Sequence, residues 1–339
     1  MENPRNLSFI ACAGEALIDL IGKPDGSYEA CMGGAVFNLA RALACQGVNT
    51  YYLNPLSADR FGRMLRASLE ADGVHAAQSQ AVAEVTSLAV VGLTAEGHPD
   101  YAFYREKVAD RATDAQSLIA ACSAIDKLGM VCTGALALAP GDEALYLPWL
   151  QAQKRAGRLL VVDANLRPSV VKDMATYRSN VLAALGLAHV LKVSDEDLAA
   201  LAVPGVGALD SAQRLLQSCD ASVMALTLGD KGAYLLAKYG AHVRVWRAQE
   251  TQAVQVVDTV GAGDCFLAGL LAALCQAGVR SPAALQALDS AIAQAALAHG
   301  VASASLCVMQ RGCTPPSWQA ASARAAQVQV EQVAPAQAV

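Results

Sequence analysis

Short apolar runs alternate with longer apolar or amphipathic segments along most of the chain. The short runs are typical of buried strands and lie at residues 9–14, 130–133, 159–163, 189–193, 223–228 and 233–237. The longer segments have helical length and lie at residues 35–46, 62–71, 142–156, 210–218, 262–277 and 282–298. This alternation predicts an α/β fold in which a mainly parallel sheet carries helices on both faces. Ligands of such sheets bind beyond the carboxyl ends of the strands.

Two regions depart from the alternation. Residues 18–31 and 85–105 contain stretches of period two, with turns expected at Pro24-Asp-Gly and Glu96-Gly-His-Pro. They predict antiparallel hairpins, and an ordinary edge hairpin explains them as well as a specialised one. Residues 319–339 form an Ala/Gln/Val-rich tail, which we expect to begin as a helix and then fray, and to which we assign no function.

The most informative motif is Asp258-Thr-Val-Gly-Ala-Gly-Asp264, a glycine-rich turn that runs into an apolar helix. Gly261 and Gly263 let the backbone turn tightly and approach a ligand. The first amides of the helix and its dipole form an anion site. Asp264, at the same helix start, is held ionised and can accept a proton. An anion site beside a base is what phosphoryl transfer to an alcohol requires.

Taken alone, this motif is explained more simply as a turn with a helix-capping acid. It is not a P-loop, because no Gly-Lys-Ser/Thr follows, and it lacks the third glycine and the ribose-binding acid of the dinucleotide fingerprint. The rest of the chain decides between the simple and the catalytic interpretation.

The segment 258–269 resembles the second signature of the ribokinase-like, or pfkB, carbohydrate kinases. Five further motifs occur in the order of that family, and the resemblance covers roughly residues 9–316: Gly33-Gly-Ala-Val-Phe-Asn38, Asp59-Arg-Phe-Gly62, Asp163-Ala-Asn165-Leu-Arg167-Pro168, Leu191-Lys-Val-Ser194-Asp-Glu-Asp197 and Leu226-Thr227-Leu-Gly229-Asp-Lys231-Gly232. Each motif is weak by itself, but six in order are specific. The runs Gly14-Glu-Ala-Leu-Ile-Asp19 and Phe103-Tyr104-Arg105-Glu106 are more like the fructokinase and 2-keto-3-deoxygluconate kinase branch.

The resemblance implies a ribokinase-like kinase domain over residues 1–318, with the segments near 18–31 and 85–105 forming a small β-lid over a sugar. It also implies that Asp264 is the catalytic base and that the backbone of Gly261, Ala262 and Gly263 forms the anion hole. A homodimer formed through the lid is a further expectation.

Sugar-binding residues follow in part from their chemistry. The carboxylate of Asp19 can accept hydrogen bonds from two hydroxyls, and the amide of Asn38 can both donate and accept. Gly33 and Gly34 would let the backbone approach the sugar ring. A turn residue and a helix cap are the alternative interpretations of Asp19 and Asn38.

Two arginines, Arg105 and Arg167, each end a strand-like run, where a surface salt bridge is the ordinary interpretation. By resemblance both bind substrate. Since Arg binds carboxylates in bidentate fashion, a sugar acid stays open as the substrate.

Nucleotide contacts fall by resemblance on Ser194, Thr227, Gly229 and Gly232, with ATP as the phosphate donor. The family pattern Asn-x-x-Glu is here Ser194-Asp-Glu-Asp197, a departure that leaves Asp197 as the candidate for holding Mg²⁺ through water. An ordinary helix N-terminus also explains this acidic cluster. Asp258 is a candidate ligand for a monovalent cation, for which K⁺ is the candidate ion.

Composition limits the partners and the cellular compartment that we expect for this protein. The 339 residues are 54% hydrophobic and 16% charged with a net charge of −5, so a large core is possible and nucleic acid is not an expected partner. Ten cysteines without a Cys-x-x-Cys pair, and no signal peptide, favour a reducing cytoplasm. No apolar stretch of membrane-spanning length is free of charge and glycine, so we expect no membrane insertion.

The sequence therefore predicts an ATP-dependent sugar kinase, with fructokinase as the first choice. The rival within the same class is 2-keto-3-deoxygluconate kinase. From another class, a non-catalytic sugar-binding regulator is a remote alternative, and the intact turn before Asp264 argues against it.

Overall fold

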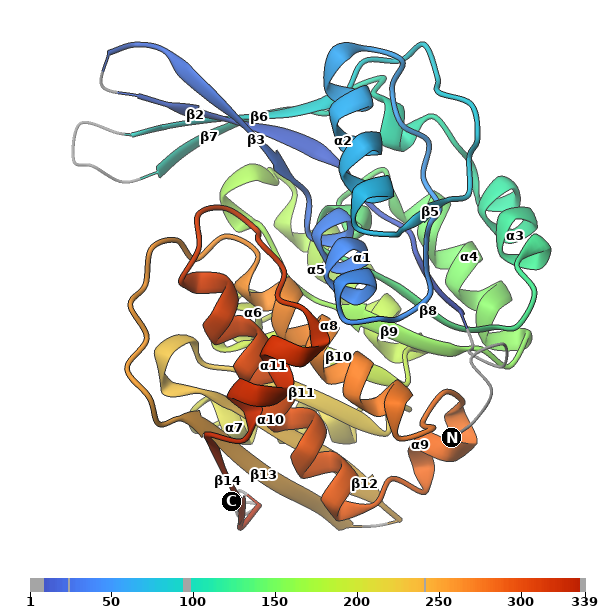
Figure 1. Ribbon diagram of the computed structural model, residues 1–339. Helices are drawn as coiled ribbons and strands as arrows, with labels where there is room; N and C mark the ends of the chain where they lie inside the picture. Colours follow the sequence, from blue (N-terminus) through green and yellow to red (C-terminus); the bar gives the residue numbers. More distant parts are fainter. Residues whose placement is uncertain (1–8, 24, 94–98, 241, 336–339) are drawn as a thin grey trace.

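The computed structural model describes residues 9–23, 25–93, 99–240 and 242–335 and is built around a sheet of ten strands (Figure 1). In spatial order these strands are β14 (Val328–Val333), β13 (His242–Glu250), β12 (Ala233–Tyr239), β11 (Val223–Thr227), β10 (Val190–Ser194), β9 (Leu159–Asp163), β8 (Leu128–Gly134), β1 (Phe9–Cys12), β4 (Thr50–Tyr52) and β5 (His75–Ala76). Pairing is parallel from β5 to β11 and antiparallel from β11 to β14. The predicted mainly parallel α/β sheet is confirmed.

Helices cover both faces of this sheet, because strand residues alternate between two apolar clusters. Leu159 and Val161 of β9 join one cluster, whereas Leu160 and Val162 join the other. The first cluster is completed by side chains of α1 (Ala35–Cys45), α2 (Arg60–Ala71), α8 (Ala262–Gln276), α9 (Pro282–Gln286), α10 (Ser290–Val308) and α11 (Trp318–Ala325). The second is completed by α3 (Ala115–Ala124), α4 (Glu143–Arg155), α5 (Met174–Leu187), α6 (Asp195–Ala200) and α7 (Ala208–Gln217).

A second sheet of four strands projects from the main body near the top of the view in Figure 1. Its order is β3 (Tyr28–Gly33), β2 (Leu17–Gly22), β6 (Ser87–Leu93) and β7 (Pro99–Tyr104). The pairs β2–β3 and β6–β7 are antiparallel, and β2–β6 is parallel. The hairpins expected from the period-two segments are therefore present, although Pro24 and residues 94–98, where their turns were expected, lie outside the described residues. We call this sheet the lid.

Two expectations for the C-terminal region were wrong. The helix expected at 282–298 is two helices, α9 and α10, because the side chain of Asp289 accepts a hydrogen bond from the amide of Ala291 and starts a new helix there. The tail does not fray after its helix: β14 pairs with β13 along its whole length. Val328 and Val330 pack against the core, which explains why this Ala/Gln/Val-rich segment is held in place.

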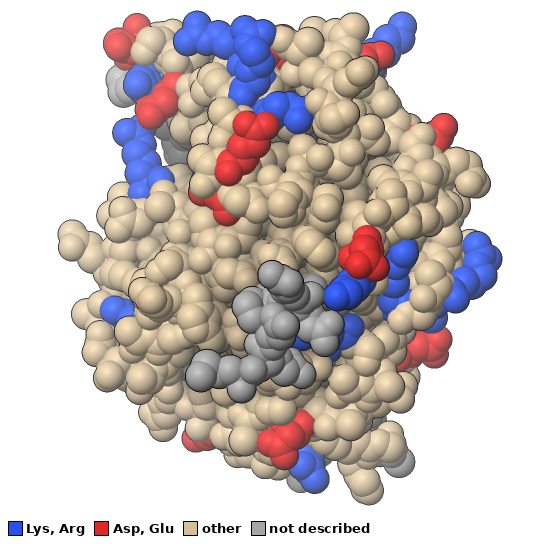
Figure 2. Space-filling model, turned by 45° about the vertical axis from the view of Figure 1, so that its right-hand side comes forward, with Lys and Arg blue, Asp and Glu red and all other residues tan. Residues whose placement is uncertain are grey.

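Helix α10 is, within the described ranges, the one helix long and apolar enough to cross a membrane by length and composition. In this fold it packs against α8 and the sheet, and 61% of its apolar window is buried in the protein. The face of the molecule in Figure 2 is mostly uncharged, with Lys and Arg interspersed with Asp and Glu. This agrees with the low proportion of charged residues in the sequence.

Candidate active site

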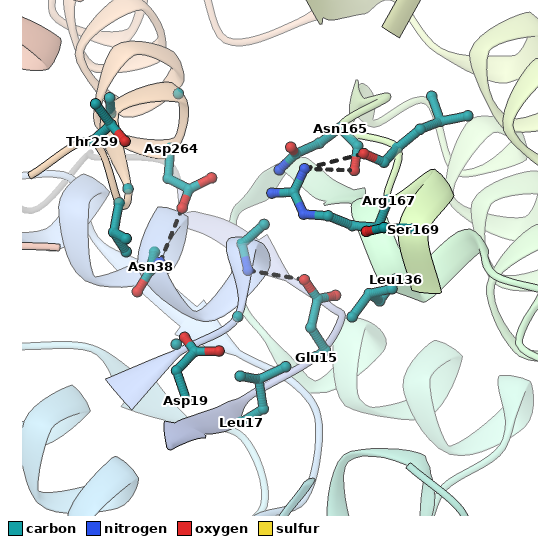
Figure 3. A pocket seen from close by; sticks show the side chains of 18 of the residues that line it. Glu15, Leu17, Asp19, Asn38, Leu136, Asn165, Arg167, Ser169, Thr259 and Asp264 are labelled. Atoms are coloured by element: carbon teal, nitrogen blue, oxygen red, sulfur yellow. Dashed lines mark hydrogen bonds between the residues drawn. The ribbon is translucent and has the colours of Figure 1, made fainter. Parts of the chain in front are cut away.

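A polar pocket of about 600 Å³ opens between the lid and the carboxyl edge of the main sheet (Figure 3). The segments that follow β1, β8, β9 and β10 all contribute to its wall, as expected for ligand sites in parallel sheets. The lid contributes Leu17 and Asp19, and the turn before α8 closes one end. The polar side chains that line it include Glu15, Asp19, Asn38, Asn165, Arg167, Glu196, Thr259 and Asp264.

The glycine-rich turn forms the start of α8. Gly261 has φ 77°, a left-handed conformation that favours glycine, and it immediately precedes the helix. Residues Gly261, Ala262 and Gly263 line the pocket, so the positive end of a 15-residue helix faces this cavity. The start of α8 thus lies where the anion site was predicted, and anion binding there stays a prediction.

Asp264 lies in the first turn of α8, with only 7% of its surface exposed. Its Oδ2 accepts a hydrogen bond of 3.0 Å from Nδ2 of Asn38, which the dashed line in Figure 3 marks. Burial raises the pKa of Asp264 to about 6, while the bond from Asn38 and the charge of Lys192 lower it. The carboxylate can therefore be ionised at neutral pH and still accept a proton.

Lys192 is a site residue that the sequence analysis missed. Its Nζ lies 3.0 Å from Oδ1 of Asp163, and both side chains are buried. A Cβ placed on Gly263 would lie 3.0 Å from the same Nζ, so this ammonium group sits directly beneath the turn. The signal was a charged residue inside the otherwise apolar run of β10, because a lysine is rarely buried without a partner. Burial opposes the charge, but Asp163 and other nearby acids raise the pKa of Lys192 and keep it cationic.

At the lid end of the pocket, Asp19 and Gly33 lie together as expected. A Cβ on Gly33 would be 2.2 Å from Oδ2 of Asp19, so glycine is required for this carboxylate to occupy its place. Burial raises the pKa of Asp19 to about 6, and the charge of Arg167 lowers it. Gly34 has φ 105° and precedes α1, where it passes close to the carbonyl of Glu15.

Glu15 is a second residue that we missed, although it follows β1 within the quoted Gly-Glu motif. Its Oε1 accepts a hydrogen bond of 2.9 Å from the amide of Ala35, at the start of α1. Its Oε2 is buried and has no hydrogen-bond partner among the described residues. Burial raises the pKa of Glu15 to about 7, and the charge of Arg105 lowers it. A buried, unpartnered oxygen beside a cavity is a ready acceptor for a ligand hydroxyl.

The two predicted arginines have different positions. Arg167 lines the pocket and points across it toward Asp264 (Figure 3). Arg105 is not among the residues that line it, so the geometry supports direct contact with substrate for Arg167 only. The side chain of Arg105 is only 12% exposed, and its guanidinium is held by Asp110 at 3.0 Å and by Asp142 at 3.4 Å. The same guanidinium donates a hydrogen bond of 3.3 Å to the carbonyl of Leu136, a residue that lines the pocket.

A second pocket of about 500 Å³ adjoins the first and shares Thr259, Ala262 and Gly263 with it. Thr227, Gly229 and Gly232, three of the four residues expected to contact the nucleotide, line this second pocket. Its remaining wall is largely apolar and comes from the loop after β13, from α8 and from α10: Val254, Val256, Phe266, Val301, Ala304 and Val308. The turn before α8 therefore separates a polar pocket from an apolar one.

Ser194 lines neither pocket, so the geometry does not support its expected contact with the nucleotide. Its Oγ accepts from the amide of Asp197 at 3.0 Å, and Oδ2 of Asp197 accepts from the amide of Ser194 at 2.8 Å, so the two form a capping box at the start of α6. Oδ1 of Asp197 accepts from the amide of Leu166 at 2.7 Å. Both carboxylate oxygens of Asp197 thus accept hydrogen bonds from backbone amides. The neighbouring Glu196 is exposed and lines the polar pocket.

Asp258 joins two segments of the chain. Its Oδ1 accepts from the amide of Val260 at 3.0 Å, and its Oδ2 accepts from the amide of Gly312 at 2.8 Å. The glycine-rich turn is thereby tied to the loop that follows α10.

The sequence pattern of the pfkB family carbohydrate kinases matches residues 7–320. The chain belongs to this family. Fructokinase from Rhizobium leguminosarum bv. trifolii is 31% identical over 273 residues, which are 78% of this chain and 79% of that protein. The predicted activity class is confirmed: the protein is a sugar kinase.

Solved structures of this family have the same fold. Fructokinase from Xylella fastidiosa with bound ATP has a TM-score of 0.80 at 24% identity and covers 93% of this chain and 97% of its own. A double-mutant fructokinase from Vibrio cholerae O395, bound to fructose, ADP and potassium ion, has a TM-score of 0.77 at 25% identity and covers 94% of this chain and 98% of its own. The predicted ribokinase-like fold is confirmed.

Proposed function

We propose that this sugar kinase is an ATP-dependent fructokinase whose catalytic base is Asp264. The observation that carries this proposal is the position of Asp264, beside the turn where the polar and the apolar pocket meet. A sugar in the first pocket and a nucleotide in the second would bring a hydroxyl and the γ-phosphate together at this turn. The fructokinase relatives support fructose as the acceptor.

In this reaction Asp264 would accept the proton of the attacking hydroxyl as its oxygen bonds to the γ-phosphorus of ATP, while the bond from that phosphorus to the β–γ bridging oxygen breaks and ADP leaves. Positioned bases of this kind typically contribute about 10²–10⁴ in rate. The amides at the start of α8 stabilise the charge on the transferring phosphoryl group, and Lys192 adds a fixed positive charge beneath them. Asn38 orients the carboxylate through its hydrogen bond.

Sugar recognition falls to three polar side chains of the first pocket: Glu15, Asp19 and Asn38. The two carboxylates accept hydrogen bonds from hydroxyls, and Asn38 has a buried Oδ1 without a hydrogen-bond partner among the described residues. These acceptors suit a neutral polyhydroxylated ligand. Thr227, Gly229 and Gly232 would contact the nucleotide from the apolar pocket.

A 2-keto-3-deoxygluconate kinase stays the second candidate, and one observation favours it. Arg167 is a cation within the polar pocket, and a sugar acid would pair with it. Against this stand the carboxyl groups of Glu15 and Asp19 in the same pocket, which repel an anion when they are ionised.

Metal ions would support this chemistry from two places. Mg²⁺ supplies charge neutralisation for the triphosphate, and Glu196 fits a water-mediated contact better than Asp197, because Glu196 is exposed and lines the polar pocket whereas Asp197 is buried. Asp258 fits K⁺, because each of its oxygens accepts one hydrogen bond and keeps a lone pair. The potassium ion in the Vibrio cholerae structure supports this second assignment.

A reducing cytoplasm is the proposed compartment, supported by ten free thiols in the part of the chain that the structure describes. We further propose a homodimer formed through the lid, supported by exposed apolar side chains on its strands: Ile21, Tyr28 and Tyr104 are 37%, 58% and 61% exposed.

A substrate screen tests the proposed function. ATP consumption is measured with fructose, ribose, 2-keto-3-deoxygluconate and adenosine at matched concentrations. We expect the highest kcat/KM with fructose. A clearly higher value with 2-keto-3-deoxygluconate would replace fructokinase by the second candidate. No turnover with any of these substrates would favour the non-catalytic sugar-binding regulator.

A further inference from the structure

Three cysteine side chains meet directly behind the glycine-rich turn. Cys265 follows Asp264 on α8, Cys307 lies in the last turn of α10, and Cys313 lies in the loop after α10. All three are buried, and their Sγ atoms lie within 4.8 Å of one another. Within the described ranges, they are the one group of three potential metal-ligating side chains whose ligand atoms approach so closely.

This arrangement is close to that of a metal–thiolate centre. In a tetrahedral zinc site the Zn–S bonds are about 2.3 Å, so bound sulfurs lie about 3.8 Å apart. The three sulfurs therefore need to move by only about 1 Å to surround one ion. They come from three separate segments of the chain, which the fold has already brought together, so little loop ordering would oppose binding.

We propose that Cys265, Cys307 and Cys313 form a binding site for one thiophilic cation of the d¹⁰ class, with Zn²⁺ as the common cellular example. Three S–H bonds are exchanged for three metal–sulfur bonds, and three protons pass to solvent. A Zn²⁺ ion would leave the centre with one net negative charge. The guanidinium of Arg41 donates to the carbonyl of Cys313 at 3.4 Å and offsets this charge in part, since it is also paired with Asp72 at 2.6 Å. Water or a backbone carbonyl completes the coordination.

Occupancy of this site changes the turn, because the sulfurs touch it. Cys307 Sγ donates to the carbonyl of Val260 at 3.6 Å, and a Cβ on Gly261 would lie only 2.3 Å from Cys313 Sγ. Drawing the three sulfurs around an ion shifts the atoms that support the anion hole. The cation is therefore an inhibitor of phosphoryl transfer, a consequence that rests on the proposed function, whereas the binding itself does not.

Cadmium titration of the full-length protein tests the site. The protein is reduced, freed of metal with a chelator, and titrated with Cd²⁺ while the ultraviolet charge-transfer absorption of Cd²⁺–thiolate bonds is recorded. We expect one tight equivalent per chain in the wild type. Cys307→Ala and Cys313→Ala should weaken this equivalent by more than about 100-fold, since loss even of an outer partner of a metal ligand typically costs about 10–100-fold. Cys275→Ala, at a half-buried thiol near the far end of α8, is the matched control and should bind as the wild type does.

A second measurement needs no variant. Alkylation of the wild type during mild denaturation, mapped by mass spectrometry, should show that one equivalent of Cd²⁺ protects Cys265, Cys307 and Cys313 ahead of the other seven cysteines. Equal protection of all cysteines, or equal Cd²⁺ affinity of wild type and Cys307→Ala, would overturn the site.

The inhibition has its own readout. One equivalent of Cd²⁺ or Zn²⁺ should lower turnover of fructose in the wild type and in Cys275→Ala, and a chelator should restore it. Undiminished turnover at full occupancy would overturn the link to the turn. Absence of turnover before any metal is added would count against the proposed function and not against the site.

Discussion

Charge placement around Asp264 gives this carboxylate a pKa suited to a base. Burial alone would keep it protonated, whereas Asn38, Lys192 and Arg167 each favour the ionised form. Its pKa of about 6 means that the base is ionised above this pH and protonated below it. Turnover should therefore fall as the pH is lowered through about 6, because the proton acceptor is lost.

Lys192 offers a direct test of this balance. Lys192→Met alone would leave Asp163 as an uncompensated buried charge and destabilise the fold by roughly 3–5 kcal/mol. The informative variant is therefore Lys192→Met combined with Asp163→Asn, compared with Asp163→Asn alone. Loss of the lysine charge raises the pKa of Asp264, so the acidic limb of the kcat/KM profile should move to higher pH. If both variants share one acidic limb, Lys192 is only a structural partner of Asp163.

The effect of Arg167→Ala on substrate affinity distinguishes a neutral sugar from a sugar acid. With a neutral sugar, Arg167→Ala should cost about 1 kcal/mol in affinity, the value of an ordinary hydrogen bond. With a sugar acid, loss of the ion pair should cost on the order of 2–5 kcal/mol. We expect the smaller effect on the KM for fructose. A larger loss for 2-keto-3-deoxygluconate than for fructose, in the same variant, would favour the acid as the native substrate.

At the scale of elements, β14 completes the edge of the main sheet. It contributes a full antiparallel ladder to β13, and Arg324 in α11 pairs with Glu250 of β13 at 2.7 Å. A chain that ends after Ala326 should lose roughly 2–4 kcal/mol in free energy of unfolding, because several ladder hydrogen bonds and the packing of the valines disappear. Urea unfolding measures this loss, with a chain ending after Val333 as the control. Identical midpoints for the two chains would show that β14 is dispensable.

Sequence patterns predicted the elements whose signal is local. The buried parallel strands and the helices at 35–46 and 262–277 have apolar periodicity of their own, and the turn before Asp264 has its glycines. The sequence of β14 has a weak strand pattern, because half of its residues are polar. It forms a strand through its pairing with β13, which a local pattern does not reveal. The ion pairs of Arg105 could not be predicted for a similar reason, because its partners Asp110 and Asp142 meet it only in the folded chain. Lys192 escaped notice because its partner Asp163 lies on a neighbouring strand.

At the scale of the whole molecule, the lid has strand edges and apolar side chains that are open to another chain. Among the described strands, its edge strands β3 and β7 each pair with a single neighbour, and both carry an exposed tyrosine. Exposed apolar side chains beside free strand edges favour association.

Light scattering should therefore give twice the mass of one chain. The double variant Tyr28→Ser and Tyr104→Ser should shift the protein toward monomer, while Val206→Ser, at an apolar side chain 82% exposed but outside the lid, should not. A wild-type protein that stays monomeric at assay concentration would contradict the proposed dimer through the lid.

The most direct test of the site as a whole is the turnover of Asp264→Asn with fructose and ATP. The amide keeps the size of the side chain but cannot accept the hydroxyl proton, so kcat should fall by about 10²–10⁴ while nucleotide binding and thermal stability are retained. Near wild-type kcat in a folded Asp264→Asn protein would contradict the assignment of this residue as the base, and with it the proposed mechanism.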